Sequence, residues 1–196
     1  MERGEVVHCG GTGKALARAP GTGAPLPALR PAFAAVVVAA GEGLRAGQPV
    51  PKQFATWRGK PVLRHSVEAL AAVGANPLVV AIPQGAEAIA EKAVAGVSGV
   101  RFVTGGATRQ LSVRAALEAM ESDAPARVLI HDAARPDLPE AVIDATLAAL
   151  TAHPGAVPVL PVVDSLLASE GAVMRDTADR GTLRRVQTPQ AFRFAD

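Results

Sequence analysis

The residues best suited to chemistry lie in a glycine-rich loop that follows a short apolar run. Gly41 and Gly43 carry no side chain, so the backbone there can approach a ligand closely and turn its amides toward an anion. Arg45 and Lys52 follow in the same stretch, AAGEGLRAGQPVPKQF. A bare backbone with two cations suits a triphosphate, because negative charge gathers on the phosphorus and on the leaving group during transfer. The loop therefore predicts a phosphate site with Arg45 and Lys52 as catalytic cations.

A dinucleotide-binding site is the alternative for the same loop. GEGLRA satisfies G-x-G-x-x-G/A with Ala46 in the last position. That motif requires a helix to begin at the loop, and Gly47, Pro49 and Pro51 disfavour one. The acidic residue expected about 20 positions later is also missing, because the chain there reads KPVLRHS. The triphosphate site is therefore preferred.

Further polar segments follow apolar runs in the same way. They read TGGATRQ, HDAARP and VVDS. The apolar runs predict strands over 33–40, 77–83, 100–106 and 126–136, with an edge-like fifth strand over 155–165 because its prolines cannot donate to a ladder. Ligands of such sheets bind beyond the carboxyl ends of the strands, so one cleft is expected to collect these segments.

Helical periodicity fills the intervals between these strands. Helices are predicted over 61–73 and 84–95, after a Thr108 cap, and after residue 136. Alternating strands and helices predict an α/β fold, in which a mainly parallel twisted sheet carries helices on both faces.

Composition and charge narrow the class of protein. The chain is 49% hydrophobic and 19% charged, which is typical of a globular domain. Aromatic residues make up only 3%, too few for base-stacking platforms, and residues 32–196 carry 16 basic and 16 acidic side chains. A nucleic-acid partner is therefore not expected. The single cysteine and the absence of any long apolar run predict a cytoplasmic protein with no membrane partner.

The first 31 residues differ from the rest. They hold six glycines and four prolines without a sustained helical or alternating pattern, which predicts a flexible N-terminal leader over 1–31. GGTGKA within it is similar to a phosphate loop, but His8 stands where the first glycine is required and Ala15 replaces Ser or Thr. One folded domain over 32–196 remains.

Five motifs carry a resemblance to a known family. AAGEGLRAGQPVPKQF, GKPVLRHSVEAL, VTGGATRQLSVRAAL, VLIHDAARP and RRVQTPQAF have the order and spacing found in 2-C-methyl-D-erythritol 4-phosphate cytidylyltransferases. The chain resembles that family from about Phe33 to its last residue. The resemblance implies the Rossmann-like nucleotidyltransferase fold, and transfer of CMP from CTP to methylerythritol phosphate in non-mevalonate isoprenoid biosynthesis. It also implies Mg²⁺, held mainly by the CTP phosphates.

The resemblance also implies roles for individual residues. Arg45 and Lys52 fall on the triphosphate and the transition state. The positions implied for CTP are Ala39, Ala40, Gly41, Gly43, Gly106, Arg109, Ser112, Asp132 and Ala133. The positions implied for the methylerythritol phosphate are Arg135, Ser165, Arg180 and Thr188.

The stretch around 163–187 resembles an arm that two subunits exchange, so the resemblance implies a protruding dimerisation arm, a homodimer, and an Arg180 that serves the partner's site. Ser165 stands where the family usually has Thr. Family members continue past QTPQAF, so 32–196 is expected to be a cytidylyltransferase domain without its C-terminal part. Two alternatives remain: a cytidylyltransferase for a pentitol phosphate such as ribitol 5-phosphate, and a CTP-binding module without turnover.

Overall fold

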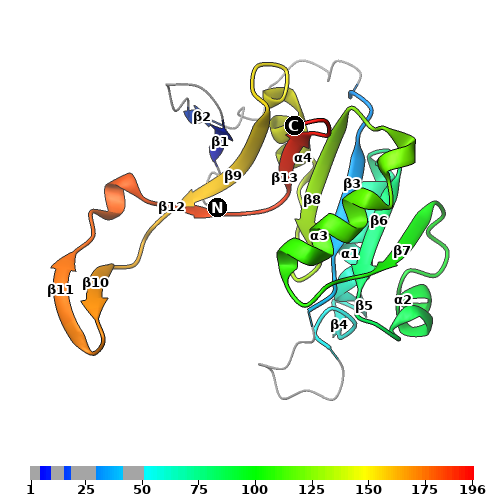
Figure 1. Ribbon diagram of the computed structural model, residues 1–196, viewed down its shortest axis with the longest axis horizontal. Coiled ribbons are helices and arrows are strands. Elements are labelled where there is room, and N and C mark those ends of the chain that lie inside the picture. The colour runs from blue at the N-terminus through cyan, green and yellow to red at the C-terminus, as the bar shows by residue number, and fades with distance from the viewer. Residues whose placement is uncertain (1–4, 10–15, 19–29, 42–50) are drawn as a thin grey trace.

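Four parallel strands form the centre of the molecule. The computed structural model describes residues 5–9, 16–18, 30–41 and 51–196. The central strands are β3 (Ala34–Val38), β6 (Leu78–Ile82), β7 (Val100–Thr104) and β8 (Arg127–Asp132), in the spatial order β8-β3-β6-β7 (Figure 1). The apolar runs of β3, β6 and β8 reflect their burial on both faces of the sheet, whereas β7, at the edge, is only partly buried. The mainly parallel α/β fold predicted from the sequence is confirmed.

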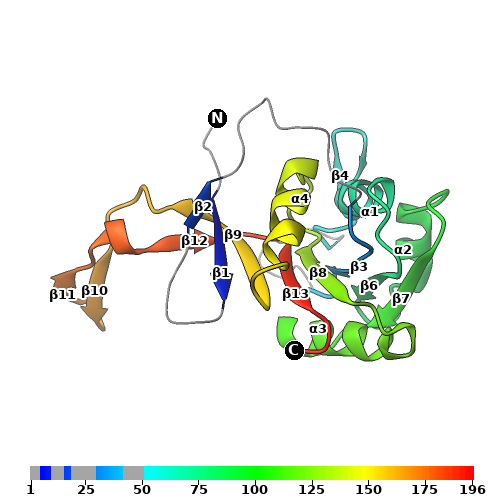
Figure 2. The same cartoon turned by 90° about the horizontal axis from the view of Figure 1, so that it is seen from above.

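Helices cover both faces of this sheet, as predicted. α3 (Arg109–Glu118) packs on one face, where Ala116 and Met120 meet Val36 and Val79. α1 (Val62–Ala72), α2 (Glu87–Ala93) and α4 (Glu140–Ala149) supply the opposite core, and Figure 2 shows α3 across the sheet from α1 and α4. The periodic apolar positions that predicted these helices are all in the two cores: Leu63, Val67, Leu70, Ile143, Leu147, Leu150, Val113, Leu117 and Met120.

Local signals explain where the helices begin. Thr108 caps α3, because its hydroxyl accepts a hydrogen bond from the amide of Leu111 at 3.1 Å. Pro61 directly precedes α1, and Pro139 directly precedes α4. A single-turn 3-10 helix, η2 (Glu121–Asp123), joins α3 to the chain that leads into β8.

The sheet continues beyond β8 in antiparallel pairing, and here one prediction is wrong. β9 (Gly155–Pro161) is not an edge strand: β1 (Glu5–Cys9) pairs with it on one side, and β12 (Arg184–Val186) and β13 (Gln190–Arg193) pair with it on the other. The prolines of β9 do not confine it to an edge, because each proline keeps its carbonyl. The Pro158 oxygen still accepts from the amide of Gln187 at 2.8 Å.

Two short strands lie within the range predicted to be a leader. β1 extends the sheet from β9, and β2 (Leu16–Arg18) pairs with β1. The boundary of the folded domain near residue 32 stays a prediction. No helix in the described part of the chain has the length and the apolar character of a membrane span.

An arm protrudes from the sheet between β9 and β12. It consists of a hairpin, β10 (Leu167–Glu170) with β11 (Val173–Thr177), followed by the 3-10 helix η3 (Arg180–Thr182). Figures 1 and 2 both show the hairpin well apart from the central strands. A smaller hairpin of β4 (Thr56–Trp57) and β5 (Lys60–Pro61) precedes α1.

Candidate active site

The carboxyl ends of the four parallel strands meet at one edge, where the predicted site residues gather. Backbone hydrogen bonds continue past the strands: the amide of Ala39 donates to Ala81 at 2.8 Å, and the amide of Ala133 donates to Val38 at 3.0 Å. The amide of Gly105 donates to Ile82 at 2.8 Å. The ends of β3, β6, β7 and β8 are therefore held side by side. This edge is the place where ligands of open α/β sheets bind.

The glycine-rich loop is only partly described. Gly43 and Arg45 lie outside the described residues, so their predicted roles stay predictions. Lys52 is exposed in a turn just beyond the loop. Ala39, Ala40 and Gly41 follow β3 directly, and the ideal position of a Cβ at Gly41 has open space around it. The start of the loop therefore presents accessible backbone at the edge of the sheet.

Gln53 is a site residue that the sequence analysis missed. Its side chain is 3% exposed, and its Nε2 donates to the carbonyls of Ala39 at 2.7 Å and Gly41 at 2.8 Å. The main-chain carbonyl of Gln53 accepts from the amide of Leu63, the second residue of α1, at 2.8 Å. Gln53 therefore fixes the chain beside Lys52 to the end of β3. Gln53 lies in PKQF, where no helical or alternating pattern of apolar residues indicates that a side chain is buried.

Replacing Gln53 with methionine is expected to lower the free energy of unfolding by about 2 kcal/mol, because the two carbonyls lose their common donor in a buried place. Urea unfolding measures the effect. Gln110→Met is the matched control, since Gln110 is exposed on α3, and it is expected to change stability by less than about 0.5 kcal/mol. Equal stability of the two variants would contradict this role for Gln53.

The TGG segment after β7 is shaped by close packing. The buried Ser112 hydroxyl accepts from the amide of Gly106 at 3.1 Å and lies 2.9 Å from the carbonyl of Thr108. A Cβ at Gly105 would lie 2.2 Å from the Cβ of Ala40, and one at Gly106 would lie 2.4 Å from the Cβ of Leu111. Both positions require glycine because neighbouring chain comes too close. Ser112 shapes this loop from beneath, and its predicted contact with cytidine stays a prediction.

Gly105→Ala is expected to destabilise the fold by about 2 kcal/mol through overpacking. The added methyl group would also lie 2.8 Å from the Ser112 oxygen. The double variant Gly105→Ala/Ala40→Gly removes the opposing methyl group and is expected to recover more than half of the loss in thermal unfolding. If the double variant were less stable than Gly105→Ala, the contact with Ala40 would not be the cause.

Asp132 lies between two arginines at the end of β8. The Nε atom of Arg109 lies 2.8 Å from one carboxylate oxygen, and the Nε of Arg135 lies 3.8 Å from the other. The arginines are 45% and 43% exposed, so both guanidinium groups remain accessible to a ligand. One carboxylate with two guanidinium groups leaves a net positive charge. The cluster therefore suits an anionic ligand with hydroxyl groups.

Two glutamines on either side of Thr188 extend this cluster. The Oε1 of Gln190 accepts from Arg109 at 3.1 Å, and the Oε1 of Gln187 accepts from Arg135. The hydroxyl oxygen of Thr188 contacts Asp132 directly, where it accepts from the Asp132 amide at 3.3 Å. The resemblance predicts Thr188 as a site residue but neither glutamine. The QTPQ motif contains both, although only the pairing of β13 with β8 brings them to the site.

His131 is buried directly beneath the cluster. Its ring bonds to Thr188 on one side and to the carbonyl of Arg135 on the other, both at 3.0 Å. Burial lowers the pKa of His131 to about 4, against a weaker opposing effect of the hydrogen bond to the Arg135 backbone. The side chain is therefore neutral near pH 7 and out of reach of a ligand.

The remaining acceptor residues of the prediction lie on the arm. Ser165 precedes the β10–β11 hairpin, and Arg180 begins η3. The Arg180 guanidinium donates to the carbonyl of Val163 at 2.8 Å, within the same arm. In both views the hairpin lies away from the strand ends that hold the other site residues (Figures 1 and 2). In the described part of the chain, no hydrogen bond or ion pair joins Ser165 or Arg180 to Arg135 or Thr188.

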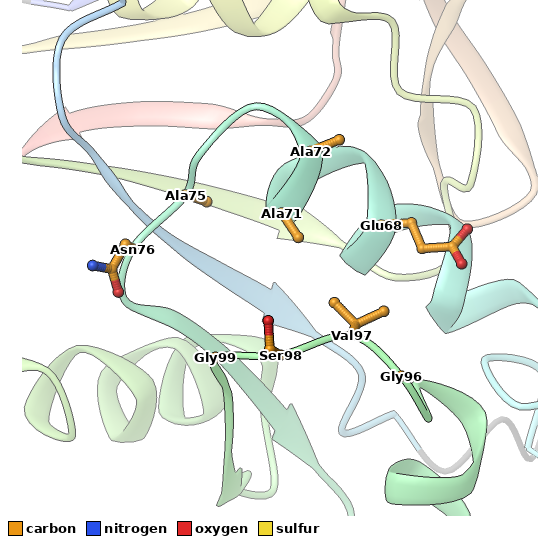
Figure 3. Close-up of a pocket in the computed structure, with 9 residues that line it drawn as sticks. All are labelled: Glu68, Ala71, Ala72, Ala75, Asn76, Gly96, Val97, Ser98 and Gly99. Atoms are coloured by element: carbon orange, nitrogen blue, oxygen red, sulfur yellow. The ribbon is translucent and has the colours of Figure 1, made fainter.

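Two cavities in the described part of the chain lie at the opposite edge of the sheet. One of about 580 Å³ lies where β6 and β7 begin, between Asn76, Ser98 and the end of α1 (Figure 3). The other, of about 480 Å³, lies where β8 begins and β13 ends. The only charged side chain of the first is Glu68, whose carboxylate bonds to Lys60 and Arg64. Neither cavity includes a predicted site residue.

The fold and this site define an α/β protein of the nucleotidyltransferase class. The family model described as "IspD: 2-C-methyl-D-erythritol 4-phosphate cytidylyltransferase" matches residues 33–196, so the chain belongs to this family. The family predicted from the sequence is confirmed.

Individual relatives agree with this assignment. The chain is 66% identical over 170 residues to the "Bifunctional enzyme IspD/IspF" of Erythrobacter litoralis, covering 87% of this chain and 44% of that protein. It is 48% identical to the 2-C-methyl-D-erythritol 4-phosphate cytidylyltransferase of Cereibacter sphaeroides, covering 82% and 72%. The crystal structure of the cytidylyltransferase from Thermus thermophilus superposes with a TM-score of 0.68 at 36% identity, covering 84% and 71%. The chain thus spans less than half of the bifunctional relative.

Proposed function

We propose that this chain transfers CMP from CTP to 2-C-methyl-D-erythritol 4-phosphate and releases pyrophosphate. The observation that carries the proposal is the cluster of Arg109, Asp132, Arg135 and Thr188 at the carboxyl edge of the sheet, beside the bare Gly105–Gly106 backbone. Membership of the cytidylyltransferase family supports it. Non-mevalonate isoprenoid biosynthesis is the corresponding pathway, and we propose a cytoplasmic location because one cysteine permits no internal disulfide.

The residues at this edge suit an in-line displacement. A phosphate oxygen of the acceptor attacks the α-phosphorus of CTP, and the bond from that phosphorus to the bridging oxygen breaks, so that pyrophosphate leaves with the electron pair. A phosphate monoester is already anionic near neutral pH, so the step requires no general base, which agrees with a buried and neutral His131. Lys52 supplies positive charge to the triphosphate, and Arg135 supplies it to the acceptor phosphate.

Mg²⁺ is the cofactor we propose for this reaction. The described residues contain no group of three histidine, cysteine, aspartate or glutamate side chains that could hold a metal ion. We propose that the triphosphate oxygens and water would carry the ion, as is common for Mg²⁺. When bound in that way, the ion neutralises charge on the phosphates. The cations of the chain then orient the complex.

Pyrophosphate release tests the proposal. The chain is incubated with CTP and Mg²⁺, and methylerythritol phosphate or ribitol 5-phosphate is added in parallel. Release with methylerythritol phosphate alone is the expected result. Release with ribitol 5-phosphate alone would show a pentitol-phosphate enzyme instead. CTP binding by calorimetry without release from either acceptor would contradict the proposed activity and point to a CTP-binding module.

We also propose a homodimer in which the arm of one subunit completes the site of the other. The arm and the adjoining β12 expose several large apolar side chains: Val163, Leu166, Leu167, Val173, Met174, Leu183 and Val186. Val173 and Met174 are 60% and 63% exposed in the single chain. A partner subunit would bury this surface and receive Ser165 and Arg180 at its acceptor site.

The double variant Val173→Asp/Met174→Asp is expected to shift the protein from dimer to monomer, because two carboxylates would be placed in an apolar interface. Light scattering coupled to size exclusion measures the mass. Ile89→Asp is the control, since Ile89 is exposed on α2 and away from the arm. A monomeric wild type, or a dimer that survives the double variant, would contradict the role of this hairpin.

A further inference from the structure

His131 joins two residues of the proposed acceptor site. Its ring lies at the carboxyl end of β8 and is 1% exposed, so a substrate cannot touch it. Nε2 lies 3.0 Å from the carbonyl oxygen of Arg135, and Nδ1 lies 3.0 Å from the hydroxyl oxygen of Thr188. Both ring nitrogens are therefore engaged by acceptor-site residues that are far apart in the sequence.

The direction of each hydrogen bond follows from the chemistry of the partners. A carbonyl oxygen only accepts, so Nε2 must carry a proton toward Arg135. In the neutral ring Nδ1 is then an acceptor, and the Thr188 hydroxyl donates its one proton to it. The same hydroxyl oxygen accepts from the amide of Asp132 at 3.3 Å. One neutral histidine therefore sets the direction of the whole chain of bonds from Asp132 to Arg135.

This direction limits what Thr188 can bind. Its only proton points at His131, so it has none to donate to a phosphate oxygen, which only accepts. One lone pair of the hydroxyl oxygen remains after the contact with Asp132. That lone pair can accept a hydrogen bond from a ligand hydroxyl. A polyol phosphate offers such hydroxyls beside its phosphate.

We propose that His131 is a positioning residue that holds Thr188 as the acceptor for a substrate hydroxyl. The inference rests on the proposed function and deepens it, because it divides the acceptor between two residues. Thr188 receives a hydroxyl of the polyol, and the guanidinium of Arg135 receives the phosphate. The bond from Nε2 to the Arg135 carbonyl fixes the tautomer of the ring, while the amide of Arg135 donates to the carbonyl of Asp132 at 3.0 Å and anchors the Arg135 main chain without His131.

Two conservative variants separate the two sides of the imidazole ring. Asparagine places its amide where Nδ1 lies and can still accept from Thr188, whereas glutamine reaches the place of Nε2 and can still donate to Arg135. His131→Gln is expected to raise the KM for methylerythritol phosphate about tenfold, as for one lost hydrogen bond. The KM for CTP is expected to stay within about twofold, and His131→Asn is expected to keep both values near those of the wild type. Equal losses in both variants, or a matching rise in the KM for CTP, would overturn the proposal.

A double-variant cycle tests whether His131 acts through Thr188. Thr188→Val removes the hydroxyl and is expected to raise the KM for the acceptor about tenfold, whereas Thr188→Ser keeps it near the wild-type value. His131→Gln/Thr188→Val is expected to cost no more than either change alone, because both remove the same bond. A roughly additive loss, about a hundredfold, would mean that the two residues act independently.

Two competitive inhibitors separate the hydroxyl from the phosphate. Unphosphorylated methylerythritol offers only hydroxyls, and inorganic phosphate offers only the anion. Thr188→Val is expected to weaken inhibition by methylerythritol about tenfold and to leave inhibition by phosphate unchanged. The opposite pattern would show that Thr188 binds the phosphate.

Nitrogen chemical shifts of the imidazole give a readout that does not need turnover. The wild type at pH 7 is expected to show a neutral His131 with its proton on Nε2, and Thr188→Val is expected to move the Nδ1 resonance. A ring protonated on Nδ1 would overturn the proposal. A wild type that releases no pyrophosphate would contradict the proposed function, and the tautomer would still decide separately whether His131 orients Thr188.

Discussion

Replacing Lys52 with alanine is expected to lower turnover about a hundredfold or more, because the transition state loses a cation beside the triphosphate. Lys52 is exposed in the turn that Gln53 fixes to the end of β3, so its position does not depend on its own packing. Pyrophosphate release measured over a range of CTP concentrations separates kcat from KM. The larger effect is expected in kcat, since charge gathers on the phosphates during the reaction.

A matched lysine distinguishes this effect from a general loss of charge. Lys92 is exposed near the end of α2, and Lys92→Ala is expected to keep turnover within about twofold of the wild type, as for an exposed residue outside the site. The thermal midpoints of both variants are expected to match that of the wild type. Turnover of Lys52→Ala within threefold of the wild type would show that this mechanism is wrong.

The central fold could be predicted from the sequence because its signals are local. β3, β6 and β8 are short apolar runs buried on both faces, β7 is a partly buried run at the edge, and the helices between them show one apolar face each. The order of these elements along the chain implies a parallel sheet, since each crossover contains a helix. The Thr108 cap was visible for the same reason: the residue and the amide that it caps are three positions apart.

The antiparallel half of the sheet could not be predicted in this way. β12 and β13 are three and four residues long, and their partners lie 23 or more positions away along the chain. Their short segments have no period that distinguishes a strand from a loop. The prediction that β9 is an edge strand is wrong because proline content reports missing donors only. The pairing of β9 depends on where β1, β12 and β13 pack.

Some residues of the candidate site could be predicted from local sequence, and others depend on contacts between distant parts of the chain. Residues at strand ends, such as Asp132 and Gly106, could be predicted from their place after an apolar run. Gln53, Gln187 and Gln190 could not, because their partners become neighbours only in the folded chain. The structure places His131 among these residues too, since its contact with Thr188 joins β8 to the segment before β13. The roles of Gly43 and Arg45 stay predictions.

Stability is expected to fall as the pH drops from about 6.5 to about 4, and His131 is expected to account for about 3 kcal/mol of that fall. Above the ordinary histidine pKa the ring is neutral in both the folded and the unfolded chain, so it adds no pH dependence. Below that pKa, His131 is protonated in the unfolded chain but stays neutral in the folded protein, and this difference favours unfolding. This pH dependence of stability levels off near pH 4, where His131 becomes protonated in the folded protein as well.

The variant His131→Gln isolates this contribution, because every other titrating group stays in place. Urea unfolding of the wild type and the variant at several pH values gives the difference between their free energies of unfolding. That difference is expected to change by about 3 kcal/mol in favour of the variant between pH 7 and pH 4. Between pH 7 and pH 8.5 it is expected to stay constant, which serves as the internal control. Parallel curves down to pH 4 would mean that His131 is accessible to protons in the folded protein, and the neutral ring that orients Thr188 would then lose its physical basis.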